Sequence, residues 1–219
     1  CHGWWRSSNV RRILVLGGGG HAKVVIGLLK RDARWSILGY TDPVGRGGIL
    51  GVGYLGDDSA LGSLAARYKG LGAVVGVGHV KSSEIRRRIA QHAEGLGLLF
   101  PCILSPNAVV GEETSLGDGT VALDGALVNV GAAIGRHCIL NSHCVVEHDA
   151  SVGDFVHICP GAVLSGGASV GDDVLVGAGS CIVQGVNVCG GAVIGAGSVV
   201  AADISEPGVY AGNPARRIA

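Results

Sequence analysis

A run of polar and charged residues from Asn141 to Asp149 stands out in a stretch otherwise rich in small and aliphatic residues. Within this run His148 is followed directly by Asp149. A histidine beside a carboxylate is suited to act as a general base, because the carboxylate orients the ring and stabilises the imidazolium. Acyl transfer from a thioester to an amine or a hydroxyl needs such a base. We therefore predict that His148 is the general base and Asp149 its partner.

Four consecutive glycines near the start of the chain form a second candidate site. The sequence Gly17-x-Gly19-x-x-Ala22 satisfies the pattern of a phosphate-binding loop between a strand and a helix. Glycines let the backbone approach a pyrophosphate, and the start of a helix supplies N–H groups and the positive end of a dipole. A tight turn without a ligand remains an alternative. NAD remains another, although about 90 residues are few for the two halves that a dinucleotide needs.

Alternating strand and helix patterns surround these glycines. We expect strands over residues 12–16, 36–41 and 73–77, and helices over 24–30 and 83–91. The second strand ends at Asp42, whose carboxylate could accept a ribose hydroxyl.

From Ile103 to Ile204 the chain divides into 17 six-residue repeats without a gap. The second residue of each repeat is a large aliphatic in 16 of the 17, and the later residues are small. One aliphatic side chain in six fills a narrow interior, small residues allow corners, and three repeats close one coil of 18 residues that is stable only when stacked. The repeats therefore predict a parallel β-helix of five to six coils. Stacking places residue i+18 above residue i, so Gly166 should lie over His148 and offer its N–H to an oxyanion.

Composition supports this architecture and excludes others. The 40 glycines argue against a helical bundle, and the balance of 17 basic with 17 acidic residues argues against a nucleic-acid partner. The short run Arg86-Arg87-Arg88 is interpreted as a solvent-exposed helix face. No apolar run is long enough to span a membrane. The five cysteines inside the repeats are interpreted as reduced structural thiols of a cytoplasmic protein. Residues 1–9 are left unassigned.

The repeats resemble the left-handed β-helix of the hexapeptide acyltransferase superfamily, and the tail Gly212-Asn213-Pro214-Ala215-Arg216 resembles the element that closes many of these enzymes. A Rossmann-like domain with a G-x-x-G-H loop before such a helix resembles the sugar O/N-acyltransferases, including the PglD- and NeuD-like aminosugar N-acetyltransferases. This resemblance implies an α/β domain over residues 10–100, a β-helix domain over 101–219, a homotrimer, and acetyl-CoA as the acyl donor without a metal.

The same resemblance assigns binding roles to individual residues. Nucleotide-sugar contacts are implied for residues in and near the glycine loop, namely Gly19, Gly20, His21, Asp42 and Gly78. Asn141 would hold the acceptor sugar. Contacts to CoA are implied for His157, Ala178 and Ala196. Pro43 replaces a second acid that some relatives carry.

The remaining polar residues of the repeats leave alternatives open. Glu147 is expected either to contact the acceptor or to be structural, and His137 and His143 are expected at an interface or in a wall. The γ-class carbonic anhydrases share this fold and place zinc histidines five residues apart, as His143 and His148 are. Their third histidine would fall at Asn107, so a zinc site is not favoured.

We therefore expect an acetyl-CoA-dependent N-acetyltransferase that acts on the amine of a nucleotide-diphosphate amino sugar, with UDP as the expected nucleotide, in bacterial glycan biosynthesis. The alternatives are an O-acetyltransferase of sialic acid or a related sugar, and a non-catalytic nucleotide-sugar-binding protein.

Overall fold

The computed structural model describes residues 11–45, 47–79 and 82–219. The chain divides into two compact units. The first contains the described residues up to Gly78 together with Glu84–Ile103, and the second contains His79–Ser83 together with Leu104–Ala219.

The first unit is built on a three-stranded parallel sheet with the order β2-β1-β3. Its strands are β1 (Arg11–Leu16), β2 (Trp35–Thr41) and β3 (Gly72–Val75). The side chains from Ile13 to Leu16 in the central strand are at most 1% exposed, because the sheet is covered on both faces. The chain leaves β1 to one side to form β2 and returns to the other side to form β3. The glycine loop after β1 therefore lies at a topological switch point, where open α/β sheets bind ligands.

Helices follow each strand of this unit: α1 (Gly20–Lys30), the short 3₁₀ helix η2 (Asp58–Ala60) with α2 (Leu61–Arg67), and α3 (Glu84–Gly95). The expected strands and two of these helices are present. Helix α1 begins at Gly20 rather than at residue 24, because the last glycine of the loop already forms the first turn. Helix α2 was not predicted, since it has seven residues and buries only Leu61.

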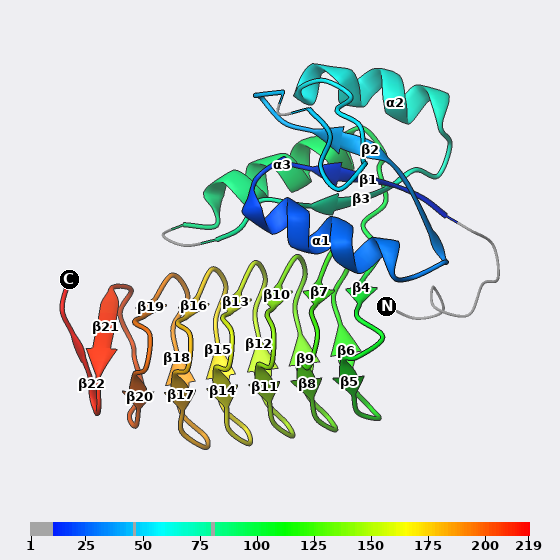
Figure 1. Ribbon diagram of the computed structural model, residues 1–219. Helices are drawn as coiled ribbons and strands as arrows, with labels where there is room; N and C mark the ends of the chain where they lie inside the picture. The colour runs from blue at the N-terminus through cyan, green and yellow to red at the C-terminus, as the bar shows by residue number, and fades with distance from the viewer. Residues whose placement is uncertain (1–10, 46, 80–81) are drawn as a thin grey trace. The chain divides into compact units, whose positions relative to one another are not determined.

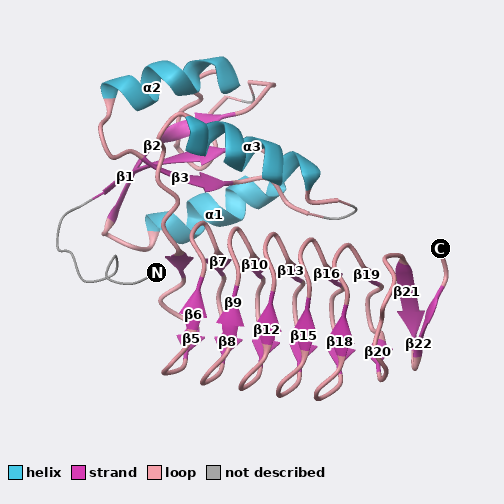
Figure 2. Ribbon diagram, turned by 180° about the vertical axis from the view of Figure 1, so that it is seen from behind, coloured by secondary structure: helices cyan, strands magenta, loops and turns pink. Residues whose placement is uncertain are grey.

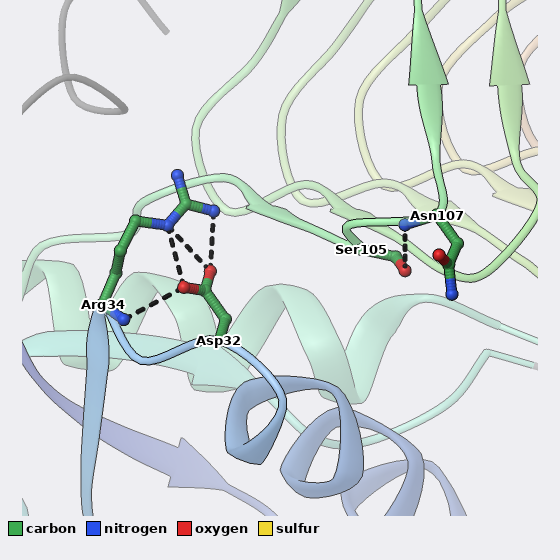
Figure 3. Close-up of polar contacts among 4 residues, drawn as sticks. All are labelled: Asp32, Arg34, Ser105 and Asn107. Carbon is green, nitrogen blue, oxygen red and sulfur yellow. Dashed lines mark hydrogen bonds and ion pairs between the residues drawn. The ribbon is translucent and has the colours of Figure 1, made fainter.

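The turn between α1 and β2 is held by the ion pair of Asp32 with Arg34 (Figure 3). Nη2 of Arg34 lies 2.6 Å from Oδ2 of Asp32, and the backbone N–H of Arg34 donates to Oδ1 at 3.0 Å. The hydrogen bond from Arg34 is the main cause that lowers the pKa of the Asp32 carboxyl.

The second unit confirms the six-residue repeat, because each of the 17 repeats begins with a two-residue strand. Figures 1 and 2 show the strands stacked in coils from β4 to β20. These strands are β4 (Ile103–Leu104), β5 (Val109–Val110), β6 (Ser115–Leu116), β7 (Val121–Ala122), β8 (Leu127–Val128), β9 (Ala133–Ile134), β10 (Ile139–Leu140), β11 (Val145–Val146), β12 (Ser151–Val152), β13 (His157–Ile158), β14 (Val163–Leu164), β15 (Ser169–Val170), β16 (Leu175–Val176), β17 (Cys181–Ile182), β18 (Asn187–Val188), β19 (Val193–Ile194) and β20 (Val199–Val200).

Three sheets form the faces of this β-helix, and from β4 to β20 successive strands of a sheet come from successive coils and pair in parallel. Ile139 pairs with His157, which is the predicted offset of 18 residues. The eight-stranded sheet contains β4, β7, β10, β13, β16, β19, β21 and β22; the six-stranded sheet contains β5, β8, β11, β14, β17 and β20; the five-stranded sheet contains β6, β9, β12, β15 and β18. Nearly all second residues of the strands are buried, as the aliphatic pattern predicts.

The β-helix ends in a hairpin of β21 (Val209–Gly212) and β22 (Ala215–Arg217), which extends the eight-stranded sheet (Figure 1). The tail that resembles the closing element of acyltransferases forms this hairpin. The five cysteines of the repeats are free. In the described part of the chain, no helix has the length and apolar character that a membrane crossing requires.

Candidate active site

The glycine loop joins the end of β1 to the start of α1, and its four glycines have different surroundings. Gly17 has a positive φ of 114°, and a Cβ on Gly18 would lie 2.7 Å from Cε2 of Tyr40. These two positions therefore need glycine for the loop itself. Gly19 and Gly20 are exposed, and a Cβ on either would meet nothing within 4 Å. Their backbone is open to a ligand at a helix start that no side chain caps.

Asp42 supports this loop from the end of β2. Its Oδ2 accepts a hydrogen bond from the N–H of Gly18 at 2.7 Å, and its Oδ1 accepts one from the N–H of Val44 at 2.9 Å. The carboxylate therefore positions the glycine loop and keeps further lone pairs for a ligand hydroxyl.

Gly78 follows β3 and lies beside His21, because a Cβ on Gly78 would be 3.7 Å from Cβ of His21. The predicted contacts after all three strands thus meet at the same edge of the sheet. The interpretation of Arg86-Arg87-Arg88 as a solvent-exposed helix face is wrong for Arg86, whose buried guanidinium donates to the carbonyls of Val75 and Val77 and holds the end of β3. A charged residue at a helix position facing the core was the available signal.

His148 and Asp149 follow β11, at the corner between the six-stranded and five-stranded sheets. Nδ1 of His148 lies 2.9 Å from Oδ2 of Asp149. This hydrogen bond is the main cause that raises the pKa of His148 above its ordinary value of 6.5. The side chain of His148 is 52% exposed, so its Nε2 can reach a substrate.

Gly166 lies directly against this histidine in the next coil. A Cβ on Gly166 would be 2.5 Å from Nε2 of His148, which no real structure would tolerate without a shift of the ring. Glycine is therefore required there for the observed ring position.

A clamp from the preceding coil holds the backbone at His148. Nδ2 of Asn129 donates to Oε2 of Glu147 at 2.9 Å, and the same oxygen accepts the N–H of His148 at 3.3 Å. The structure thus gives Glu147 a structural contact. Asn129 was missed in the sequence, although its place 18 residues before Glu147 is the signal that finds it.

Asn141 lies at the other corner of the six-stranded sheet and contacts His157, the first residue of β13 in the eight-stranded sheet. Nδ2 of Asn141 lies 3.0 Å from Nε2 of His157, and Nδ1 of His157 lies 2.8 Å from the carbonyl oxygen of His79. His157 is only 9% exposed. The residues implied for the acceptor and for CoA are therefore in direct contact with one another.

The backbone hydrogen bonds that join neighbouring coils do not use the N–H of the fourth residue of a repeat. Where the third residue is Asn or Glu, its side chain accepts this N–H, as Oδ1 of Asn141 does from Ser142 at 2.8 Å. Gly166, Ala178 and Ala196 are among the fourth residues whose N–H is not used by any hydrogen bond among the described residues. All three were predicted as backbone contacts, and their donors are available to a ligand.

The fifth residue of a repeat has a positive φ in 15 of the 17 repeats. Nine of these are glycines, and the other six are Glu113, His137, His143, Asp149, Phe155 and Asp173. A side chain in this conformation costs roughly 1–2 kcal/mol. Four consecutive repeats around His148 bear this cost, which is typical of a functional region.

His137 belongs to a wall, since its ring stacks on Phe155 at 4.8 Å between centroids. His143 is exposed.

Asn107 occupies the position where a third zinc histidine was considered, and its N–H donates to Oγ of Ser105 at 3.0 Å (Figure 3). Within residues 11–45, 47–79 and 82–219, no three His, Cys, Asp or Glu side chains gather as a metal site requires.

A β-helix of six-residue repeats, preceded by a parallel α/β unit with an open glycine loop, is the architecture that the resemblance to hexapeptide-repeat acyltransferases predicts. Residues 12–93 match the family model of the PglD N-terminal domain. GDP-perosamine N-acetyltransferase of Escherichia coli O157:H7 is 31% identical over 85 residues, which cover 39% of this chain and 38% of that protein.

Several solved structures match along nearly the whole chain. The acetyltransferase domain of PglB from Neisseria gonorrhoeae FA1090, in complex with acetyl coenzyme A, is 34% identical with a TM-score of 0.88 and covers 95% of this chain and 99% of its own. PerB from Caulobacter crescentus, in complex with CoA and GDP-perosamine, is 31% identical with a TM-score of 0.88. The match covers 96% of this chain and 98% of that one. The chain belongs to the PglD-like family of sugar N-acetyltransferases, which use acetyl-CoA.

Proposed function

We propose that this chain transfers the acetyl group of acetyl-CoA to the amine of a nucleotide-linked amino sugar, with His148 as general base. The observation that carries the proposal is the contact of His148 with Asp149 at 2.9 Å, beside the unused N–H of Gly166. A supported base and an oxyanion donor are the two groups that direct acyl transfer needs.

The proposed step is a direct attack of the amine on the thioester. The amine nitrogen forms a bond to the carbonyl carbon, and Nε2 of His148 takes a proton from that nitrogen. The N–H of Gly166 stabilises the charge on the oxygen. The carbon–sulfur bond then breaks, CoA leaves with the proton, and an amide remains on the sugar.

The first unit would bind the nucleotide diphosphate. The open backbone of Gly19 and Gly20 and the uncapped start of α1 support this role, with Asp42 and Gly78 at the same edge. UDP was expected from the resemblance, whereas two relatives are named for GDP-perosamine. GDP is therefore the second candidate.

A complete site would need a second copy of the chain. His148 and Gly166 lie at one corner of the β-helix, while Asn141, Ala178 and Ala196 lie at the corner on the opposite edge of the six-stranded sheet. In a homotrimer, one corner of each chain could face the other corner of its neighbour.

The outer surface of that same sheet fits such an assembly. The first residues of its strands are apolar and at least partly exposed in all six coils: Val109, Leu127, Val145, Val163, Cys181 and Val199. The matching residues of the five-stranded sheet are small or polar: Ser115, Ala133, Ser151, Ser169 and Asn187. A repeated apolar face is typical of a surface that another chain covers.

The test is release of CoA from acetyl-CoA across UDP-, GDP- and dTDP-linked amino sugars, with the matching hydroxyl sugars and free sialic acid as controls. We expect turnover with at least one nucleotide amino sugar and a product that gains one acetyl group on nitrogen. Faster acetylation of a free sugar on oxygen, or no turnover with any acceptor, would contradict the proposal.

A further inference from the structure

The contact of Asn141 with His157 joins two groups whose roles as donor and acceptor are ambiguous when each is considered alone. Asn141 follows β10, and His157 begins β13 one coil later. Their nitrogens Nδ2 and Nε2 lie 3.0 Å apart, and the ring nitrogen can donate or accept depending on its tautomer.

Backbone groups at both ends of this contact remove the ambiguity. The N–H of Ser142 can only donate, and it lies 2.8 Å from the side-chain oxygen of Asn141, so the amide nitrogen must face the ring. The carbonyl of His79 can only accept, and it lies 2.8 Å from Nδ1 of His157, so this nitrogen carries the proton. Nε2 must then accept from Asn141. The chain of bonds therefore has one direction, from the N–H of Ser142 to the carbonyl of His79.

We infer that His157 is held as the neutral Nδ1–H tautomer and serves as a positioning residue that fixes the amide of Asn141. The inference rests on the proposed function in one respect, namely that Asn141 holds the acceptor sugar. With one N–H of its amide on His157, Asn141 presents its second N–H in a fixed direction to an oxygen of that sugar.

This arrangement excludes His157 as a second general base. Protonation of Nε2 would place an N–H of the ring against the side-chain N–H of Asn141. If the amide of Asn141 rotated to offer its oxygen to the ring instead, its NH₂ group would face the N–H of Ser142. Both alternatives leave a donor facing a donor in a site that is 9% exposed at His157. The ring of His79 also faces this site, at 6.3 Å between ring centroids.

His79 itself lies outside the repeats, in a short segment that packs with the β-helix. The segment His79–Ser83 belongs to the second unit, where Ser83 hydrogen-bonds Asp173.

The first test is ¹⁵N NMR of the whole 219-residue chain with labelled histidines, which reports the protonation of each ring nitrogen without any need for activity. His157→Asn identifies the resonances of His157 by their disappearance. We expect a protonated Nδ1 and an unprotonated Nε2 near pH 7. An Nε2–H tautomer or an imidazolium would overturn the inference.

Asn141→Asp tests the direction of the chain. A carboxylate can only accept, so it should draw a proton onto Nε2 and convert His157 to the doubly protonated form near pH 7. A ring in this variant that keeps an unprotonated Nε2 would also overturn the inference.

Two substitutions of His157 separate its two bonds kinetically. His157→Asn keeps a donor for the carbonyl of His79 but gives Asn141 no acceptor, whereas His157→Gln places an oxygen where Nε2 was. We expect the first to raise the acceptor KM by about 10-fold with a smaller effect on kcat, and the second to restore most of the loss.

The pH profile separates positioning from base catalysis. His157→Asn should keep the acid limb of the wild-type profile, because that limb belongs to His148, and loss of the limb would make His157 the base. If no acceptor is turned over by the wild-type enzyme, the proposed function fails, while the NMR result still decides the state of His157.

Discussion

At the scale of single residues, His148 is accessible to a substrate, and its protonated form is stabilised by the carboxylate of Asp149. It is half-exposed, yet its Nδ1 is bound by Asp149 at 2.9 Å. Exposure lets Nε2 meet a substrate, and the carboxylate directs the proton-accepting nitrogen outward. The pair therefore fits a base that works at the surface of a coil rather than in a closed pocket.

The carboxylate of Asp149 should set the acid limb of the pH profile. It raises the pKa of His148, and the base acts only when neutral, so activity should rise through a pKa above 6.5. Asp149→Asn should move this limb to lower pH and reduce kcat by about 10- to 100-fold. The measurement is kcat/KM against pH for the wild type and for Asp149→Asn. The same acceptor is used for both, so that the titration of its amine affects the two profiles equally. A limb that stays in place would show that another group controls it.

Gly166 should matter for activity far more than for stability. Its substitution Gly166→Ala places a Cβ 2.5 Å from Nε2 of His148, and the half-exposed ring can swing into solvent to relieve the contact. We expect a change below about 1 kcal/mol in the free energy of unfolding and a loss of about 100-fold in kcat.

A double-mutant cycle shows whether Gly166→Ala acts through the ring. Added to His148→Ala, it should cost much less than it does in the wild type, because no ring remains to be displaced. Equal losses in both backgrounds would instead assign the effect to the oxyanion donor alone.

At the scale of elements, the glycine loop separates residues that shape a turn from residues that leave room. Gly17 and Gly18 are constrained by φ and by Tyr40, whereas Gly19 and Gly20 have open space. The sequence pattern identifies all of these glycines together but does not distinguish the two roles.

Gly20→Ala should therefore weaken nucleotide-sugar binding without loss of stability. The added methyl group meets nothing in the free protein but enters the space proposed for the diphosphate. We expect a rise of about 10-fold in Kd by calorimetry. Gly62→Ala in α2 is the matched control, since its Cβ also meets nothing, and it should keep Kd and raise stability by up to about 1 kcal/mol. Equal Kd values in the two variants would contradict a phosphate role for the loop.

The repeat made the second unit predictable at the level of single strands, because one aliphatic in six residues allows one register. The same rule that residue i+18 lies above residue i placed Gly166 on His148. Side-chain hydrogen bonds were less predictable. The contact of Asn141 with His157 spans 16 residues, and that of His157 with His79 spans 78, so no local pattern reports them. Helix α2 was missed because most of its residues are not buried.

At the scale of the whole molecule, the proposed site is divided between two corners of one β-helix. The six-stranded sheet between them is apolar on its outer surface. Both features are explained together if copies of the chain associate through this face.

Val163→Asp should disrupt this association. Val163 is the first residue of β14 in the centre of the apolar face, and a charge there would have to be buried between chains. We expect light scattering to give a trimer for the wild type and smaller species for the variant, with kcat reduced in parallel. Ser151→Asp on the five-stranded sheet is the control and should stay trimeric. A wild-type monomer with full activity would contradict a shared site.

The central claim is that His148 takes the proton from a sugar amine that attacks the thioester of acetyl-CoA. The most direct measurement compares wild type with His148→Ala for CoA release at saturating acetyl-CoA and nucleotide amino sugar, with both binding constants measured by calorimetry. We predict unchanged binding and a fall in kcat of about 10²- to 10⁴-fold for His148→Ala. A variant that binds both substrates and keeps more than a tenth of the wild-type kcat would contradict the account.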